Sequence, residues 1–228
     1  MIELKEVTKE YSKGIAALNG VSLKFRRNEF VSILGPSGCG KGTIVKELLK
    51  KYPDTYALSV SATTREPRVG EENGVHYHFI SRDEFERRID AQQILEYTTY
   101  CGNYYGTPKK ELYERTVQGI NVILEIEVEG AMNVRRLCPE AVLIYVLPPD
   151  AETLEARLRG RGTNTEEDIL NRLAKAREEI RCLPDYDYLV INEDDGAAAA
   201  AEEIVNIITS EQHKVGRNLE NAIHFFEK

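Results

Sequence analysis

Short apolar runs alternate along the chain with longer segments of helical periodicity. The apolar runs cover residues 29–35 (EFVSILG), 56–61 (YALSVS), 121–126 (NVILEI), 141–147 (AVLIYVL) and 188–192 (YLVIN). Several of these runs are uniformly apolar, which indicates strands that are buried on both faces of a sheet. Strands that alternate with helices predict an α/β fold with three layers, α/β/α, built on a mainly parallel sheet.

Helical spacing of apolar residues places helices between these runs. Ser81 and Glu84 have the spacing of a capping box at one helix start, and Thr165 and Asp168 supply polar groups at another. Residues 94–107 (ILEYTTYCGNYYGT) are instead rich in β-forming residues and interrupted by glycines. The expected helices cover residues 42–52, 81–89, 109–118, 151–162, 165–181 and 197–208.

Composition narrows the classes of function. With 228 residues the chain can bury one sizeable core without disulfide support. The formal net charge of -8 argues against nucleic acid or an anionic membrane as the main partner, because both favour a basic surface. No apolar run is long enough to span a bilayer, and the charged N-terminus lacks the apolar part of a secretory signal. The four cysteines have no paired spacing, which is typical of reduced thiols in a cytoplasmic protein.

A glycine-rich segment, GPSGCGKGT, lies between the first predicted strand and the next predicted helix. Its spacing and context are those of the phosphate-binding loop of P-loop NTPases, in which backbone N–H groups surround an anion. Lys41 supplies a mobile charge for the outer phosphates of a nucleoside triphosphate, and Thr43 is the candidate hydroxyl near Mg²⁺ because Gly42 replaces the usual Ser or Thr. The alternative is a glycine-rich turn without a ligand. The predicted ATP-binding residues are Gly35, Pro36, Ser37, Gly38, Cys39, Gly40, Lys41, Gly42 and Thr43.

A second candidate anion site lies in the segment SATTREPRVGEENGVHY. Arg65 and Arg68 flank Pro67, and their planar guanidinium groups can converge on one phosphate. Tyr77 can donate its hydroxyl to the same anion. A solvated surface turn is the alternative, since arginines are common in such turns. Two separate phosphate sites suit a donor and an acceptor of a phosphoryl group.

In their order and spacing these motifs resemble the guanylate kinases. The resemblance covers about residues 30–207 and includes the phosphate loop, SVSATTREPRVGEENGVHY, EYTTYCGNYYGT, VILEIEVEGA, RGRGT and VINEDD. It implies transfer of the γ-phosphate of ATP to GMP, with Mg²⁺ as the cofactor. It also implies a core of residues 29–62 and 110–228, a small β-rich GMP-binding subdomain of residues 63–109, and a helical lid near residues 150–175. Activity on dGMP, and the choice between monomer and homodimer, stay open.

The resemblance implies a GMP site in which Arg65, Arg68, Tyr77 and Tyr105 hold the phosphate, while Ser61, Glu96 and Thr107 read the guanine. Guanine presents N1–H and N2–H₂ as adjacent donors, which match the two oxygens of one carboxylate. Adenine lacks this pair of donors, so AMP would leave a buried Glu96 unpaired, and such sites discriminate by about 10⁴ or more. The alternative for Glu96 is a solvated carboxylate on a strand.

Phosphoryl transfer depends on positioning and on neutralising phosphate charge, so Lys41 and Mg²⁺ would serve the donor phosphates. Glu125 and Glu127 follow an apolar strand and would face the metal's water shell or the acceptor; a solvent-facing alternation is the other explanation. Asn192 matches the family's adenine contact. Glu129 departs from the pattern, because the family usually has glutamine there.

The segment EARLRGRGT resembles the lid that closes over ATP in this family. Arg157 and Arg161 lie one helical turn apart, and Arg172 follows on the next predicted helix. Arginines placed in this way can stabilise the transition state of phosphoryl transfer by about 10³ to 10⁵ in rate. The alternative is a set of surface ion pairs with Glu155, Glu166 and Glu167.

Residues 1–28 precede the guanylate kinase-like domain of residues 29–228 and resemble the start of an ABC-transporter ATPase. In that family the position of Tyr11 stacks on adenine. We expect strands at residues 2–7 and 21–25 that pair with each other or extend the sheet. The sequence argues against a transport motor, because it has no LSGGQ-like signature, no apolar strand that ends in an Asp-Glu pair and no switch histidine. A non-catalytic guanylate kinase-like binding module is the other alternative, and the intact phosphate loop argues against it.

Overall fold

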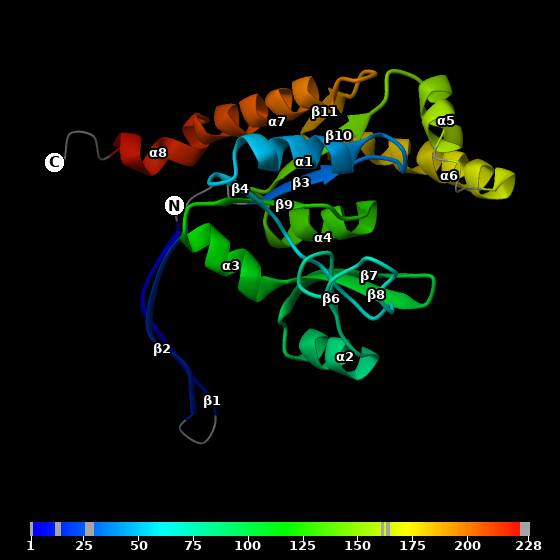
Figure 1. Ribbon diagram of the computed structural model, residues 1–228. Helices are drawn as coiled ribbons and strands as arrows, with labels where there is room; N and C mark the ends of the chain where they lie inside the picture. The colour runs from blue at the N-terminus through cyan, green and yellow to red at the C-terminus, as the bar shows by residue number, and fades with distance from the viewer. Residues whose placement is uncertain (1, 12–14, 26–29, 161, 163–164, 224–228) are drawn as a thin grey trace.

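The computed structural model describes residues 2–11, 15–25, 30–160, 162 and 165–223, and a five-stranded sheet lies at their centre (Figure 1). The five strands are β3 (Phe30–Leu34), β4 (Tyr56–Leu58), β9 (Asn121–Leu124), β10 (Val142–Leu147) and β11 (Tyr188–Ile191). Their order in the sheet is β11-β10-β3-β9-β4, and every neighbouring pair is parallel. The predicted parallel sheet is confirmed.

Strand β3 lies in the middle of this sheet, between β9 on one side and β10 on the other. The chain runs from β3 to β4 at one edge and later crosses to β10 and β11 at the opposite edge. In parallel sheets, ligands bind in the crevice outside the carboxyl ends of strands that flank such a reversal. The glycine-rich segment follows β3 directly and therefore opens into this crevice.

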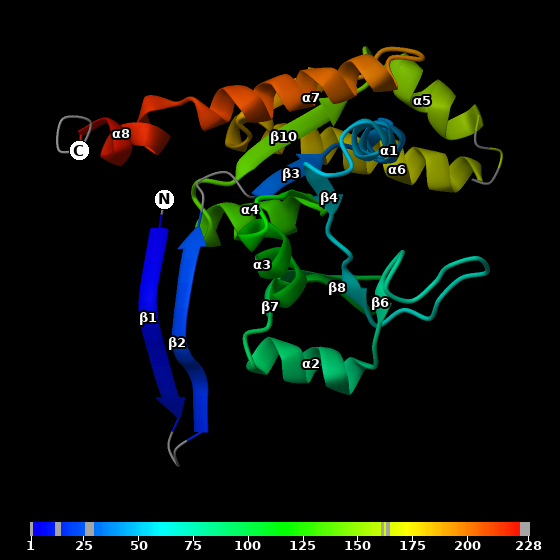
Figure 2. The ribbon, with the colours of Figure 1, turned by 60° about the vertical axis from the view of Figure 1, so that its left-hand side comes forward.

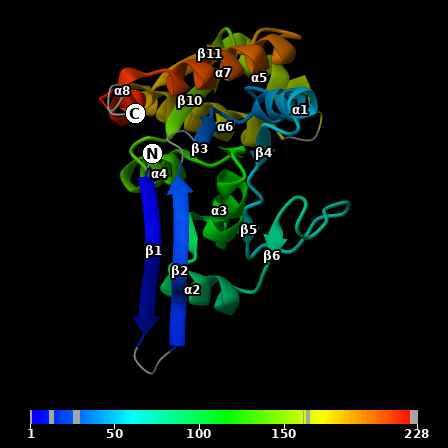
Figure 3. The ribbon, with the colours of Figure 1, turned by 90° about the vertical axis from the view of Figure 1, so that its left-hand side faces the viewer.

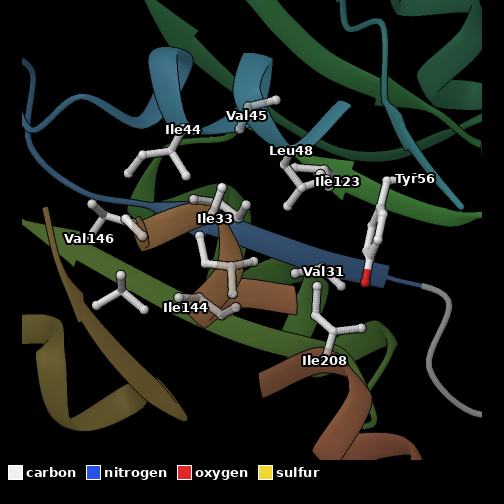
Figure 4. Close-up of a cluster of buried hydrophobic side chains, with 14 of the residues drawn as sticks. Val31, Ile33, Ile44, Val45, Leu48, Tyr56, Ile123, Ile144, Val146 and Ile208 are labelled. Atoms are coloured by element: carbon white, nitrogen blue, oxygen red, sulfur yellow. The ribbon is translucent and has the colours of Figure 1, made fainter. Parts of the chain in front are cut away.

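Two helices, α1 (Lys41–Lys51) and α7 (Ala197–Gln212), cover one face of the sheet. Ile44 and Leu48 are four residues apart in α1, so they point the same way and lie over Ile33 of β3 in the core (Figure 4). All three side chains are fully buried, and each such burial stabilises the fold by about 1.5–3 kcal/mol. This packing fixes the start of α1 at the end of β3.

Two further helices, α3 (Lys109–Val117) and α4 (Val128–Leu137), cover the other face. Leu112 of α3 and Val134 of α4 belong to the same buried cluster as Leu124 of β9. The sheet thus has helices on both faces, which gives the predicted three-layer α/β/α arrangement.

A second, smaller sheet with the strand order β6-β5-β8-β7 lies on the α3 side of the molecule (Figure 2). Helix α2 (Arg82–Asp90) packs on it, and Phe85 stacks on the ring of Tyr104 with 5.0 Å between ring centroids. The helix begins where predicted, since Ser81 Oγ accepts a hydrogen bond from the Glu84 N–H at 3.2 Å. The strands are β5 (Ala62–Thr63), β6 (His78–Phe79), β7 (Ile94–Tyr100) and β8 (Asn103–Pro108).

After β10 the chain forms two helices, α5 (Ala151–Gly160) and α6 (Glu166–Glu179), that project beside the carboxyl end of the sheet (Figure 1). Thr165 and Asp168 form the reciprocal capping box at the start of α6. Among the described residues no helix is long and apolar enough to cross a membrane. Helices α5 and α6 pack on each other through a small apolar core made by Leu154, Leu158 and Ile169.

The N-terminal strands β1 (Ile2–Tyr11) and β2 (Ile15–Phe25) pair with each other in an antiparallel two-stranded sheet. They do not extend the five-stranded sheet, and Figure 3 shows them projecting away from it. The side chain of Tyr11 lies outside the described residues, so its contact with adenine stays a prediction. The remaining elements are the 3₁₀ helix η1 (Ile180–Asp185) and the helix α8 (Val215–Ile223).

Candidate functional site

The loop between β3 and α1 passes very close to two neighbouring strands. A Cβ atom added to Gly35 (φ 152°) would lie 2.1 Å from the carbonyl oxygen of Val146. A Cβ atom added to Gly40 (φ 93°) would lie 2.2 Å from Nδ2 of Asn192. Neither position has room for a side chain, so these glycines are what let the loop lie against β10 and β11.

Helix α1 begins directly after this loop, so the backbone N–H groups of its first turn lie at the end of the loop. Its N-cap, Gly40, makes no side-chain hydrogen bond, and no acidic residue lies in its first turn. A helix start of this kind attracts phosphate through its N–H groups and its dipole. Lys41 Nζ donates to the carbonyl oxygen of Gly35 at 2.8 Å, which places the ammonium group at the loop. The geometry therefore suits an anion.

A cleft of about 170 Å³ lies beside the loop, with α6 as one wall and the start of α4 as another. Lys41 and Arg172 both line it. Arg172 also donates a hydrogen bond from its Nη1 to the hydroxyl of Ser37, so α6 touches the loop directly. Two cations from different elements thus meet at the place where a bound phosphate chain would lie.

Sequence reasoning missed a third cation in this cleft, Lys175. Its Nζ lies 2.7 Å from Oε2 of Glu127 and 3.4 Å from Oε1 of Glu179. Burial raises the pKa of Glu179, and Lys175 opposes that shift. The signal was available in the spacing, because Lys175 lies three residues after Arg172 and therefore on the same side of α6.

Arg157 and Asn192 come together at the other end of the loop. Arg157 Nη2 donates to the carbonyl oxygen of Asn192 at 3.0 Å and to Oδ1 of Asp194 at 2.8 Å. Asn192 Nδ2 donates to the carbonyl oxygen of Cys39 at 2.8 Å. Oδ1 of Asn192 and Nη1 of Arg157 are buried without a hydrogen-bond partner among the described residues. These two groups have hydrogen-bonding capacity left for a ligand.

Surface ion pairs with Glu155 and Glu166, the alternative explanation for the lid arginines, are made by Arg159. Arg159 pairs with Glu155 at 2.7 Å and also with Glu166. Arg157 pairs with Asp194 instead, at 2.8 Å, and none of Glu155, Glu166 and Glu167 is its partner among the ion pairs of the described residues. Arg161 lies outside the described residues, so its place in the lid stays a prediction.

The second anion segment places Arg65 beside two tyrosines. Its guanidinium carbon lies 5.5 Å from the centre of the Tyr77 ring, and the rings of Tyr77 and Tyr105 are 6.0 Å apart. Both terminal nitrogens of Arg65 contact the carboxylate of Glu71 at 2.9 Å, and this pairing lowers the pKa of Glu71 to about 2. The backbone N–H of Arg68 donates to the same carboxylate at 2.7 Å. Glu71, which sequence reasoning missed, orders this loop.

Glu96 is a buried carboxylate on β7, with 5% of its surface exposed. Thr107 of β8 donates its hydroxyl to Oε1 at 2.6 Å. Burial raises the pKa of Glu96, the Thr107 hydrogen bond lowers it, and the charge of Glu129 raises it further. Ser61 is half-buried immediately before β5, the strand that pairs with β8. The smaller sheet therefore gathers a carboxylate and hydroxyls of the kind that can read a guanine.

The acidic residues after β9 lie in different surroundings. Glu125 and Glu127 are exposed, and Glu127 is the N-cap of α4. Glu129, in the first turn of α4, accepts a hydrogen bond from Thr98 of β7 at 2.9 Å. This contact links the start of α4 to the strand that carries Glu96.

The donor set can be compared with what Mg²⁺ requires. Mg²⁺ is usually bound through one or two protein oxygens together with water and substrate phosphates. Thr43 is exposed in the first turn of α1, and the described residues contain no cluster of three His, Cys, Asp or Glu that could hold a metal alone. The site therefore fits an ion that is held largely by nucleotide and water.

Comparison with known proteins is consistent across sequence and structure. The family model described as guanylate kinase matches residues 27–211. The chain is 50% identical over 196 residues to the guanylate kinase of Clostridioides difficile, covering 86% of this chain and 94% of that protein. It is 47% identical over 187 residues to that of Carboxydothermus hydrogenoformans, covering 82% of this chain and 90% of that protein.

A solved structure agrees with these sequence matches. The crystal structure of guanylate kinase from Anaplasma phagocytophilum superposes with a TM-score of 0.68 at 30% identity, covering 89% of this chain and 96% of that one. The family match begins at residue 27, so it gives no support to the ABC-transporter resemblance of residues 1–28.

Proposed function

This chain belongs to the guanylate kinase family, and from that premise we propose which of its residues carry the transfer of the γ-phosphate from ATP to GMP. The observation that carries the proposal is the buried Glu96 carboxylate, which Thr107 holds from one side. A buried carboxylate in this position is stabilised by a ligand with two adjacent donors, and guanine has them.

On the acceptor side, Glu96 pairs with N1–H and N2–H₂ of guanine, and Ser61 and Thr107 complete the contacts to the base. The GMP phosphate lies at the segment between β5 and β6. It is held by the guanidinium groups and phenols of Arg65, Arg68, Tyr77 and Tyr105. The proximity of Arg65 to both rings supports this group of residues.

On the donor side, the loop of residues 35–43 surrounds the ATP phosphates, and Asn192 contacts the adenine. Thr43 supplies a hydroxyl to Mg²⁺, an ion that neutralises phosphate charge when it is bound. The unpartnered Oδ1 of Asn192 supports its role, because the exocyclic amine of adenine is a matching donor.

Between the two nucleotides, Lys41, Arg157 and Arg172 stabilise the charge that spreads over the transferred phosphoryl group. Arg161 joins them from the lid of residues 150–175. Glu125 and Glu127 face the metal's water shell or the GMP. The contact between Arg172 and Ser37 supports a lid that already reaches the loop.

The same proposal includes the location of the enzyme, its oligomeric state, its domain bounds and its partners. We place it in the cytoplasm as a monomer or homodimer, with residues 63–109 as the GMP-binding subdomain of a domain spanning 29–228. The formal net charge of -8 supports the absence of nucleic acid and anionic membranes as partners. The resemblance of residues 1–28 to an ABC ATPase stays a prediction.

The test is ADP release from ATP and Mg²⁺ with GMP, dGMP, AMP, CMP or UMP as the acceptor, coupled to NADH oxidation. We expect turnover that depends on GMP. When GDP formation is followed directly by chromatography, without coupling enzymes, it should disappear when EDTA removes the metal. Hydrolysis of ATP without an acceptor would point to a motor, and a folded protein without turnover would point to a binding module. Either result would overturn the proposed roles.

A further inference from the structure

The first turn of α4 lies against the carboxylate of Glu96. Gly130 is buried there, and a Cβ atom added to it would lie 2.5 Å from Oε2 and 3.1 Å from Cδ of Glu96. Carbon and oxygen atoms that are not bonded normally stay more than about 3 Å apart, since dispersion contacts are optimal near 3.5–4.0 Å. The carboxylate therefore occupies the space that any side chain at position 130 would fill.

The contacting atom is the end of the Glu96 side chain, so the carboxylate is the group that a side chain at position 130 would displace. Its other oxygen, Oε1, accepts the hydroxyl of Thr107 at 2.6 Å from the opposite strand. A shift away from α4 would break or compress that hydrogen bond. Gly130 and Thr107 thus hold Glu96 between them, one by contact and one by a hydrogen bond.

The backbone itself does not require glycine at position 130. Gly130 lies within α4 and has no positive φ, unlike Gly35, Gly38 and Gly40 of the phosphate loop. Glycine in a helix is less favourable than alanine, because it loses more conformational freedom on folding. The close approach of Glu96 is the feature that explains its presence.

A hydrogen bond of Glu129, the residue before Gly130, also holds the start of α4 to β7. Glu129 accepts a hydrogen bond from Thr98 at 2.9 Å. Thr98 lies two residues after Glu96 on the same strand, and both side chains meet the first turn of α4. Helix α4 cannot relax away from Glu96 without losing this contact.

We propose that Gly130 is a positioning residue for guanine recognition: its missing side chain sets where the Glu96 carboxylate stands. This inference rests on the proposed role of Glu96. Gly130 itself does not contact the nucleotide. It acts by leaving room for the Glu96 carboxylate, which does.

The test begins with Gly130→Ala. A displacement of the carboxylate by about 1 Å should raise the KM for GMP by about 10- to 100-fold and leave the KM for ATP unchanged. The matched control is Gly216→Ala in α8, where an added Cβ meets nothing within 4 Å. The control should change neither KM. An unchanged KM for GMP in a folded Gly130→Ala protein would overturn the inference.

A double-mutant cycle separates positioning from a general effect on the fold. In a Glu96→Ala background there is no carboxylate to displace, so adding Gly130→Ala should change the KM for GMP by less than about twofold. An equally large effect in that background would show a structural role and reject the inference. If Glu96→Ala alone leaves the KM for GMP unchanged, the proposed function of Glu96 fails instead.

A second variant covers the case in which Gly130→Ala does not fold. In Glu96→Asp/Gly130→Ala the shorter side chain withdraws its carboxylate from the added methyl group. Circular dichroism and thermal melting should show a folded protein whose Tm matches that of Glu96→Asp alone. A double variant that also fails to fold would contradict the inference, because the strain would then arise from another contact.

Discussion

Asn192 donates its side-chain amide to the carbonyl oxygen of Cys39 at 2.8 Å, which ties the end of β11 to the phosphate loop. Both residues are buried. The bond spans 153 positions of sequence and joins the site to the last strand of the sheet. The same side chain is the proposed adenine contact, so one amide serves both the loop and the ligand.

Asn192→Ala should therefore raise the KM for ATP by about tenfold, since a lost hydrogen bond that leaves a buried carbonyl unpaired costs about 1–3 kcal/mol. The KM for GMP should stay the same, because Asn192 is far from the smaller sheet in the fold. Steady-state kinetics with each substrate varied in turn measures both. An unchanged KM for ATP would show that the amide has no part in ATP binding.

Lys41→Met removes the mobile charge at the start of α1 while keeping a side chain of similar length. Loss of one preorganised electrostatic group lowers kcat by about 10²–10³, and we expect a decrease at least this large. Binding of GMP, measured by calorimetry, should be unaffected. A variant that keeps its full kcat would remove Lys41 from the mechanism.

Glu96→Gln should make the unliganded protein more stable at neutral pH. The folded-state pKa of Glu96 is raised, chiefly by burial, so the folded protein binds this proton more tightly than the unfolded chain. Stability from this group therefore rises as pH falls through the raised pKa, and the ionised form is unfavourable above it. The Tm of Glu96→Gln should exceed that of the wild type at pH 7 and approach it in acid. A lower Tm at pH 7 would contradict this sign.

Glu129→Gln should shift the pH dependence of GMP binding. Pairing with guanine requires ionised Glu96, so the KM for GMP rises as pH falls through the pKa of this carboxyl. The charge of Glu129 helps to raise that pKa. Its removal should therefore move the acid limb of the KM profile to lower pH, while Glu114→Gln on α3 should leave the profile in place. A shift to higher pH would refute the electrostatic coupling.

Arg65 controls the ionisation of Glu71. Its two-point contact lowers the pKa of Glu71 to about 2, so this carboxyl stabilises the loop above its ordinary pKa of 4.5 and loses that effect as pH falls through about 2. In an NMR titration of the side-chain carboxyl, Arg65→Ala should return the midpoint toward the ordinary value. If the midpoint stayed near 2, Arg65 would not be the cause.

The sequence predicted best those features that depend on neighbouring residues along the chain. The uniformly apolar runs predicted the five parallel strands, and the capping residues Ser81 and Thr165 predicted two helix starts. By contrast, β5 and β6 have two residues each, which is too short for any periodicity to show. Strand β5 depends on pairing with β8, and β6 depends in turn on pairing with β5. Both pairings are contacts between segments that are distant in the sequence or separated by a long loop.

Two residues that sequence reasoning did not single out, Lys175 and Gly130, act through contacts between elements that are distant in the sequence. Lys175 matters because α6 faces the start of α4, where Glu127 lies, and Gly130 matters because α4 packs on β7. The spacing from Arg172 places Lys175 on the same side of α6, but nothing in the residues around Lys175 or Gly130 says which element lies opposite. Glu71 lies only six positions after Arg65. An acidic residue in a polar loop is common, however, so the sequence did not indicate that Glu71 pairs with Arg65.

The most direct test of the central claim is a crystal structure of this chain with GMP and an unreactive ATP analogue bound together. We expect both oxygens of Glu96 to lie within hydrogen-bond distance of N1 and N2 of guanine, with Gly130 still against the carboxylate. A structure in which Glu96 points away from the base would contradict it.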